Sequence, residues 1–200
     1  MPRTVDLAAR EAEITAAAME LLATGGPKAV TLRALATRLG GSSTLVTHFY
    51  RNRSELLSAI TSRIVSQYEE ELAGLKEIDD PSQGLRATLE WLLPISPKDQ
   101  GFERRRVMMT VEADSDETIS GYLATMEQKE RAILRIHLSR LLPDVNIESY
   151  IDILRSFTNG IALSVVESPV AWPPSRQIEA LNRMLELLSS RRVIDATETN

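Results

Sequence analysis

The sequence predicts an all-α fold, and three observations lead to this prediction. Nearly every long segment repeats its apolar residues at the i, i+3, i+4, i+7 spacing of an amphipathic helix. No segment alternates convincingly with period two, as a half-buried strand would. Glycine and proline clusters separate the periodic segments, for example at 25–27, 40–41 and 173–174. With 200 residues, the chain has ample material for a hydrophobic core in one or two domains.

The first two helices are bounded by clear local signals. The first has a one-sided apolar stripe made of Ile14, Ala17, Ala18, Leu21 and Leu22. The Gly-Gly-Pro run at 25–27 should end this helix. Thr31 then stands at an N-cap position, with Val30 and Leu35 placed as a hydrophobic staple. A short second helix is expected over 32–38.

Two further helices follow closely. Gly40 and Gly41 should end the second helix, and Ser42 or Ser43 can cap a short third one. Its inner face is made of Leu45, Val46 and Phe49. A fourth helix is expected over 54–75, with Asn52 as its N-cap and Glu55 in a pattern like a capping box.

The rest of the chain is expected to form longer helices. They are placed near 82–93, 102–113, 116–141, 147–167 and 175–190. Breaks are expected at 79–81, at 94–101, at Pro143 and at the prolines between 169 and 174, and the polar tail is expected to fray.

The two short helices and their glycine turn form a candidate helix-turn-helix. Its inner positions are small or apolar, and Gly40 can take the left-handed conformation that the turn needs. The inner positions are Leu35, Ala36, Leu39, Gly40, Val46 and Phe49. The outer face offers short donors and acceptors suited to phosphates and base edges. These are Ser42, Ser43, Thr44, Thr47 and His48. A polar, solvated face of an ordinary helical hairpin is the alternative.

Charge is distributed unevenly along the chain. The formal net charge is −5, but residues 1–57 carry +2 and the remainder carries −7. A mildly basic head on an acidic body suits a protein that offers one end to a polyanion, and Arg33, Arg51 and Arg53 would neutralise phosphates. Two histidines and no cysteine leave little material for a metal site, and no cofactor is expected. No apolar run is long enough to span a membrane and no export signal is visible, so a cytoplasmic location is expected.

Residues 8–57 resemble the N-terminal DNA-binding domain of the tetracycline-repressor (TetR) family of bacterial transcription factors. The matching segments are the glycine-terminated first helix, "VTLRALATRLGGS" and "THFYRNRSELL". The resemblance implies a recognition helix that opens at Ser42 and ends in the aromatic pair Phe49-Tyr50, with Tyr50 among the DNA-binding residues. It also implies that Arg53, at the start of the next helix, contacts a phosphate. We therefore expect a DNA-binding domain over 1–53 and a ligand-binding and dimerisation domain over 54–200.

Two positions differ from the family pattern. Gly41 replaces the usual β-branched residue before the recognition helix, and Thr47 replaces a common backbone-contacting tyrosine. A helical partner-binding module that has kept the fold but lost DNA binding is therefore the alternative function. A helical enzyme is a second rival, but the sequence has no G-x-S-x-G, no phosphate-binding glycine loop and no H-E-x-x-H.

Adaptable apolar and aromatic residues in the body are candidates for an effector site. They are Trp91, Met108, Val111, Tyr122 and Met126, with Glu112 as a partner for a cationic ligand. Ordinary core packing is the alternative for each of them. The segments "LEWLLP", "RRR" and "SPVAWPP" resemble, in their order, the subgroup of the choline-responsive repressor of betaine synthesis, and no ligand is assigned from this.

The resemblance also implies that the last two long helices form a dimeric four-helix bundle. The candidate interface residues are Phe157, Ile161, Val165, Leu181, Leu185 and Leu188. Their apolar stripes fit an intramolecular core equally well. The predicted function is a ligand-responsive regulator, expected to be a repressor, that binds a pseudo-palindromic DNA operator as a homodimer and is released by a small-molecule effector.

Overall fold

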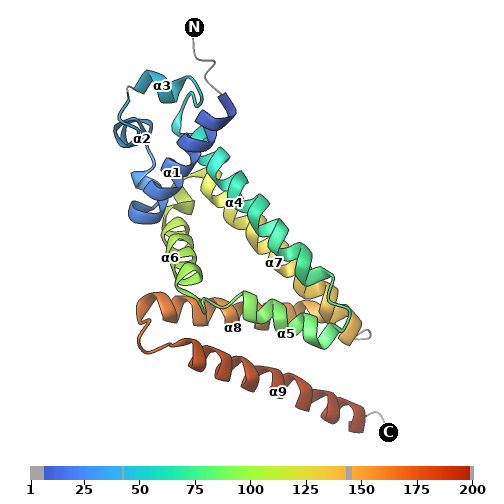
Figure 1. Ribbon diagram of the computed structural model, residues 1–200. Coiled ribbons are helices and arrows are strands. Elements are labelled where there is room, and N and C mark those ends of the chain that lie inside the picture. Colours follow the sequence, from blue (N-terminus) through green and yellow to red (C-terminus); the bar gives the residue numbers. More distant parts are fainter. Residues whose placement is uncertain (1–6, 42, 143–145, 199–200) are drawn as a thin grey trace. The chain divides into compact units, whose positions relative to one another are not determined.

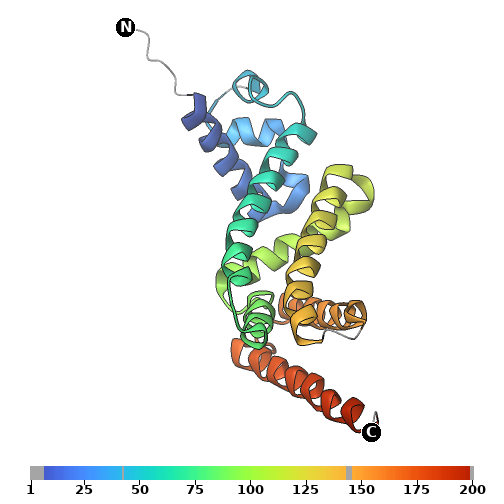
Figure 2. The same ribbon diagram turned by 90° about the vertical axis from the view of Figure 1, so that its right-hand side faces the viewer.

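In the computed structural model, which describes residues 7–41, 43–142 and 146–198, every element is helical, as predicted (Figures 1 and 2). The N-terminal helices are α1 (Leu7–Ala29), α2 (Leu32–Arg38) and α3 (Ser43–Thr47). The others are α4 (Arg53–Lys76), α5 (Pro81–Trp91), α6 (Pro97–Glu112), the 3-10 turn η1 (Ala113–Ser115), α7 (Glu117–Leu141), α8 (Ile147–Glu167) and α9 (Pro174–Glu198). Within the described residues, no helix is long and apolar enough to cross a membrane.

Helix bounds match the predictions where local signals decide them. The side chain of Thr31 caps α2 by accepting from the Ala34 N–H at 3.1 Å. Asn52 accepts from the Glu55 N–H at 2.9 Å at the start of α4. The Gly-Gly-Pro run breaks the regular helix at Gly26, whose φ of 68° is left-handed, although one more turn continues to Ala29.

Two predicted helix ends are wrong. Helix α6 begins five residues earlier than expected, at Pro97, because Ser96 and Asp99 cap it: the Ser96 N–H donates to Asp99 at 3.0 Å, and the Asp99 N–H donates to the Ser96 hydroxyl at 3.2 Å. A proline at the first helical position favours such a start. Helix α9 continues to Glu198 rather than ending near 190. The predicted break at Pro143 lies outside the described residues.

The chain divides into two compact units. The first combines residues up to Gly74 with Arg104–Glu130, and the second combines Leu75–Glu103 with the residues from Arg131 onward. This division differs from the predicted boundary at residue 53, because α4 and parts of α6 and α7 belong to the same unit as the N-terminal helices. The separation into DNA-reading and ligand-binding parts therefore stays a functional prediction.

Each unit has its own buried core. In the first unit, Ile14 and Leu22 of α1, Leu35 of α2, Val46 of α3 and Leu56 of α4 are fully buried. In the second, α5, α7, α8 and α9 all contribute to one cluster. Its members are Leu85, Leu89, Leu93, Leu134, Leu138, Ile151, Leu154, Ile161, Val165 and Leu181.

His137 of α7 is also fully buried in the second unit. Its ring lies directly against the backbone of α5 at Gly84, where a larger residue would collide with it. Burial lowers the pKa of His137, and the charge of Arg140 lowers it further. This histidine is therefore neutral and belongs to the core.

Candidate functional site

The turn between α2 and α3 has the geometry that the glycines predict. Leu39 ends α2, and Gly40 follows with a left-handed φ of 63°. The Gly41 N–H donates to the Ala36 carbonyl and the Gly40 N–H donates to the Thr37 carbonyl, both at 3.1 Å. This pair of bonds is a Schellman motif, which satisfies the last carbonyls of a helix while the chain turns sharply. Because α3 also contacts α2, the motif is a helix-turn-helix.

The outer side of α3 is open to solvent. Thr44, Thr47 and His48 are exposed and lie at the i, i+3, i+4 spacing of one helix face. Arg33 on α2 and Arg51 after α3 are also exposed. Ser42 lies outside the described residues, and of Ser43 only the backbone is described. The described face presents two hydroxyls and an imidazole, which are groups that can read base edges.

Tyr50 does not belong to this exposed face. Its side chain is only 5% exposed, and its hydroxyl lies 3.2 Å from the Thr15 hydroxyl of α1. Thr15 is itself buried and donates to the Glu11 carbonyl at 2.9 Å. The Tyr50 hydroxyl thus connects the end of the helix-turn-helix to α1, and the predicted DNA contact of Tyr50 stays a prediction. The apolar stripe of α1 did not reveal its partner, because Thr15 is polar.

Arg53 also has a place within the protein. Its guanidinium donates to the Pro27 carbonyl at 2.9 Å and to the Val30 carbonyl at 3.1 Å. A third donor, Nη1, lies 2.6 Å from Oδ2 of Asp116. Arginine can serve three acceptors at once because its donors form a rigid planar fork. The structure thus shows Arg53 bound within the protein, and its predicted phosphate contact stays a prediction.

Asp116 joins Arg53 to the beginning of α7. Its second oxygen, Oδ1, accepts from the backbone N–H groups of Thr118 at 3.0 Å and Ile119 at 3.3 Å. Burial alone would raise the pKa of Asp116, but the hydrogen bond from Arg53, helped by those two backbone groups, outweighs burial and lowers it. The aspartate is thus ionised at neutral pH. An aspartate before a helix is a common N-cap signal, but nothing in the sequence pointed to Arg53 as its partner.

Two more contacts connect the same corner of the chain to α1. The Lys28 ammonium lies 3.0 Å from a carboxylate oxygen of Glu112. Met108 packs against Gly26, where an added Cβ would lie 3.0 Å from the Met108 Cε. The segment 108–118, which we call the α6–α7 corner, is therefore held against the joint between α1 and α2.

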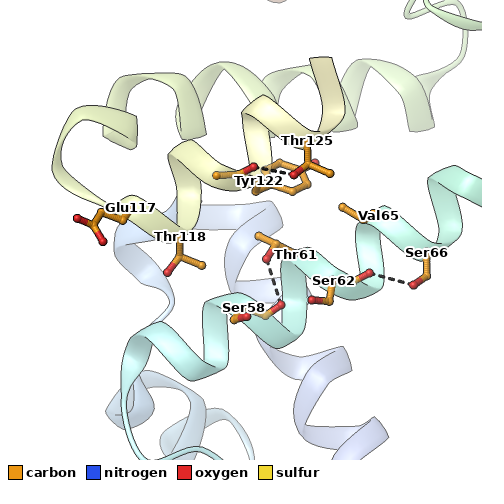
Figure 3. A pocket seen from close by; sticks show the side chains of 10 residues that line it. Ser58, Thr61, Ser62, Val65, Ser66, Glu117, Thr118, Tyr122 and Thr125 are labelled. Carbon is orange, nitrogen blue, oxygen red and sulfur yellow. Dashed lines mark hydrogen bonds between the residues drawn. The ribbon is translucent and has the colours of Figure 1, made fainter. Parts of the chain in front are cut away.

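A cleft of about 590 Å³ opens between α4 and α7 within the first unit (Figure 3). Figure 3 shows serine and threonine side chains of α4 opposite those of α7, with Tyr122 beside them. The lining consists of Ser58, Thr61, Ser62, Val65, Ser66, Glu117, Thr118, Gly121, Tyr122 and Thr125. At one end of the cleft, the hydroxyls of Ser54 and Thr118 lie 2.9 Å apart. At the other end of this helix pair, Tyr68 donates to Glu130.

Residues 14–60, which include the whole helix-turn-helix, match the family model of bacterial regulatory proteins of the tetR family. The N-terminal part of this chain is thus similar to that family. Comparison with curated proteins gives no match.

Solved structures of similar fold cover nearly the whole chain. A transcriptional regulator from Rhodococcus sp. Rha1 has a TM-score of 0.71 at 22% identity, covering 87% of this chain and 92% of the other. A TetR transcription regulator from Haloarcula marismortui has a TM-score of 0.70 at 18% identity, covering 90% and 96%. A protein from Saccharomonospora viridis, solved in complex with choline, has a TM-score of 0.74 at 18% identity, covering 90% and 97%.

The predicted effector residues do not gather in one place. Val111 is 78% exposed and does not line the α4–α7 cleft, so its place in an effector site stays a prediction. Met108 and Glu112 are engaged with α1 at the α6–α7 corner. Tyr122 does line the α4–α7 cleft, and Met126 is buried. Trp91 is half-buried in the second unit. Sequence reasoning missed the hydroxyls of the cleft, because small polar residues on a helix look like an ordinary solvated face.

The predicted dimer residues divide into two groups. Ile161, Val165 and Leu181 are at most 4% exposed, since they pack into the core of their own protomer, and their role at an interface stays a prediction. Phe157, Leu185 and Leu188 are half-buried and pack against the same core. Large apolar residues that remain exposed on these helices are Ile153 (46%), Leu163 (44%) and Leu187 (61%).

Proposed function

We propose that this protein is a ligand-responsive transcriptional repressor that binds a pseudo-palindromic DNA operator as a homodimer. The observation that carries the proposal is the glycine-turned helix-turn-helix, whose α3 leaves Thr44, Thr47 and His48 exposed on one face. A helix presented in this way fits the major groove of B-DNA. The exposed Arg33 and Arg51 supply positive charge for phosphates beside it.

Selection of bound duplexes from a random pool, followed by measurement of variants, tests this function. Thr44→Ala and His48→Ala should change the preferred bases, because these side chains reach base edges. Arg51→Ala should weaken binding to all sequences alike and reduce the salt slope by about one. If none of the three variants alters affinity or preference, α3 is not the reading helix.

The partner-binding module remains the second candidate function. It is favoured by Thr47, which stands where the family commonly has a backbone-contacting tyrosine, and by the buried Tyr50, which leaves no described tyrosine exposed at the end of α3. A protein of this class would show no sequence preference among duplexes. Selection from the random pool would then return no common motif.

For dimerisation we propose a face that differs from the predicted one. Ile153 and Leu163 on α8 and Leu187 on α9 are large apolar side chains left in solvent, which is costly for a monomer. Gly160 lies on the same exposed side of α8 as Leu163, at i+3 spacing, and allows close approach of another helix. A homodimer has two reading heads, which two half-sites about 34–36 Å apart require.

For the effector we propose the α4–α7 cleft. Its volume of about 590 Å³ is in the range of small-molecule sites, and its hydroxyls, one aromatic ring and one carboxylate can orient a small polar ligand. A ligand there would act on α4, which is joined directly to the reading head. It would release DNA only if it binds the DNA-free conformation more tightly.

Choline is the first probe for this cleft, because one protein of similar fold holds it. We expect choline to raise the Kd for the operator, and we expect Ser62→Phe, which fills the cleft, to abolish the effect. Ser139→Phe, at an exposed serine outside the cleft, should keep it. A response that survives Ser62→Phe would exclude the cleft, and the lack of any response in wild type would exclude choline.

A further inference from the structure

We propose that Arg53 and Asp116 form a latch that positions the DNA-reading head, and that Arg53 supports operator binding through this latch rather than by contact with a phosphate. The head is the part formed by α1, α2 and α3. The inference rests on the proposed function, since it concerns how the same head is held for DNA. Arg53 is thus a positioning residue.

Two backbone acceptors place Arg53 at the joint between α1 and α2. Pro27 and Val30, whose carbonyls it holds at 2.9 and 3.1 Å, lie in the last turn of α1 and just before α2. Backbone at this joint is already turned sharply, because Gly26 is left-handed and the Val30 N–H bonds back to the Pro27 carbonyl at 3.1 Å. Fixing both carbonyls therefore fixes the direction in which α2 leaves α1. The direction of α2 sets that of α3, because the two are packed together.

Asp116 attaches this joint to α7. One carboxylate oxygen accepts from the Arg53 guanidinium at 2.6 Å, and the other caps α7 by accepting from the backbone N–H groups of Thr118 and Ile119. The Asp116 side chain is 16% exposed and the Arg53 side chain is 36% exposed, so both are partly shielded from water. A movement of the first turn of α7 would thus be transmitted through the Asp116 carboxylate and Arg53 to the joint between α1 and α2.

The latch lies at the end of the α4–α7 cleft. Thr118 lines the cleft, and its hydroxyl meets that of Ser54, the neighbour of Arg53, at 2.9 Å. A ligand that spreads α4 from α7 would separate these two hydroxyls and strain the adjoining Arg53–Asp116 pair. The latch therefore gives the proposed effector site a direct connection to the head.

The direction in which Asp116→Asn changes DNA affinity distinguishes the latch from a phosphate contact. Removing a negative charge from a DNA-binding protein by itself favours DNA binding, because fewer repulsions oppose the phosphates. Asp116→Asn removes that charge and keeps a capping oxygen, since asparagine is a good N-cap. If the latch positions the head, Asp116→Asn should weaken operator binding about fivefold or more. Asp114→Asn, the same change at an exposed acid two residues away, should bind as wild type or slightly more tightly.

Arg53→Lys supplies the matching test on the other partner. Lysine keeps the positive charge that a phosphate contact needs, but it lacks the fork that reaches three acceptors. The latch predicts weaker binding with an unchanged salt slope, and the double variant Arg53→Lys with Asp116→Asn should be no weaker than the weaker single variant. Near-wild-type binding by Arg53→Lys, together with tighter binding by Asp116→Asn, would overturn the proposal.

Hydrogen exchange keeps the test decisive even if the wild type selects no duplex. That result would remove the proposed function, but the latch would still predict faster exchange of the amides of α2 and α3 in Asp116→Asn than in Asp114→Asn. Equal exchange in the two variants would show that Asp116 does not hold the head. Thermal melts of all variants check that each one is folded.

Discussion

At the scale of single residues, Gly84 of α5 leaves no room for a side chain. An added Cβ would lie 2.9 Å from Nε2 of His137 and closer still to Cε1 and Nδ1. The imidazole is fully buried, so it cannot swing away as the end of an exposed side chain would. This close approach of α5 to α7 depends on the missing side chain.

Gly84→Ala should therefore destabilise the protein by about 1–3 kcal/mol through overpacking. Gly74→Ala is the matched control, because Gly74 is also helical but nothing lies within 4 Å of its added Cβ. That control should stabilise by about 0.5–1 kcal/mol, the usual gain for alanine over glycine in a helix. Urea unfolding measures both changes, and equal effects would contradict the packing described for Gly84.

Single-residue roles were predictable where the partner is close in sequence. Thr31, Gly40 and Asn52 act on backbone groups within a few positions, so local pattern sufficed. The intramolecular contacts of Tyr50 and Arg53 were not predictable because their partners are distant: Thr15 lies 35 residues away and Asp116 lies 63 residues away. Both look like DNA contacts in the sequence, and only the fold shows what they touch.

At the scale of elements, one carboxylate joins α7 to α8. Glu148, in the first turn of α8, accepts from Arg135 at 2.7 and 2.9 Å and from Arg131 at 3.0 Å. Arg131 also donates to Asp152 at 2.7 Å. The hydrogen bonds from Arg135 and then Arg131 lower the pKa of Glu148 from 4.5 to about 2. The ionised form is thus favoured by the folded state.

Because its folded pKa is depressed, Glu148 stabilises the fold fully above about pH 4.5 and loses this effect as the pH falls towards about 2. The free energy of unfolding of Glu148→Gln should therefore be lower than that of wild type at neutral pH. The difference should shrink steadily on acidification, as followed by urea unfolding at several pH values. Glu179→Gln, at an exposed acid on α9, should show no such trend. A gap for Glu148→Gln that stays constant with pH would contradict the assignment.

Helix positions were predictable from the spacing of apolar residues and from capping signals. What each apolar face packs against was harder to predict. The stripes on α8 and α9 correctly marked apolar faces, but the same stripe serves a core or an interface. Ile161, Val165 and Leu181 proved to be core because α5 and α7 cover them within the unit. The start of α6 was missed because two prolines and a glycine masked the Ser96–Asp99 cap.

At the scale of the whole molecule, the all-helical fold followed from the sequence, but its division did not. The N-terminal helices form one compact unit with α4 and parts of α6 and α7, and a functional boundary at residue 53 stays a prediction. Contacts between segments distant in sequence, such as those of Lys28 with Glu112 and of Tyr68 with Glu130, create this unit. No periodicity within a single segment reveals such pairings.

The central claim is that two copies of this chain read one operator through α3. The most direct measurement is a mobility shift on the selected duplex at rising salt, with excess unrelated DNA and with the stoichiometry of the complex determined, for wild type and for Leu163→Glu. We predict a competitor-resistant wild-type complex of two protomers that weakens steeply with salt, and a Leu163→Glu protein that is monomeric and binds far more weakly. A wild-type shift that unrelated duplex abolishes equally well, or no shift at all, would contradict the account.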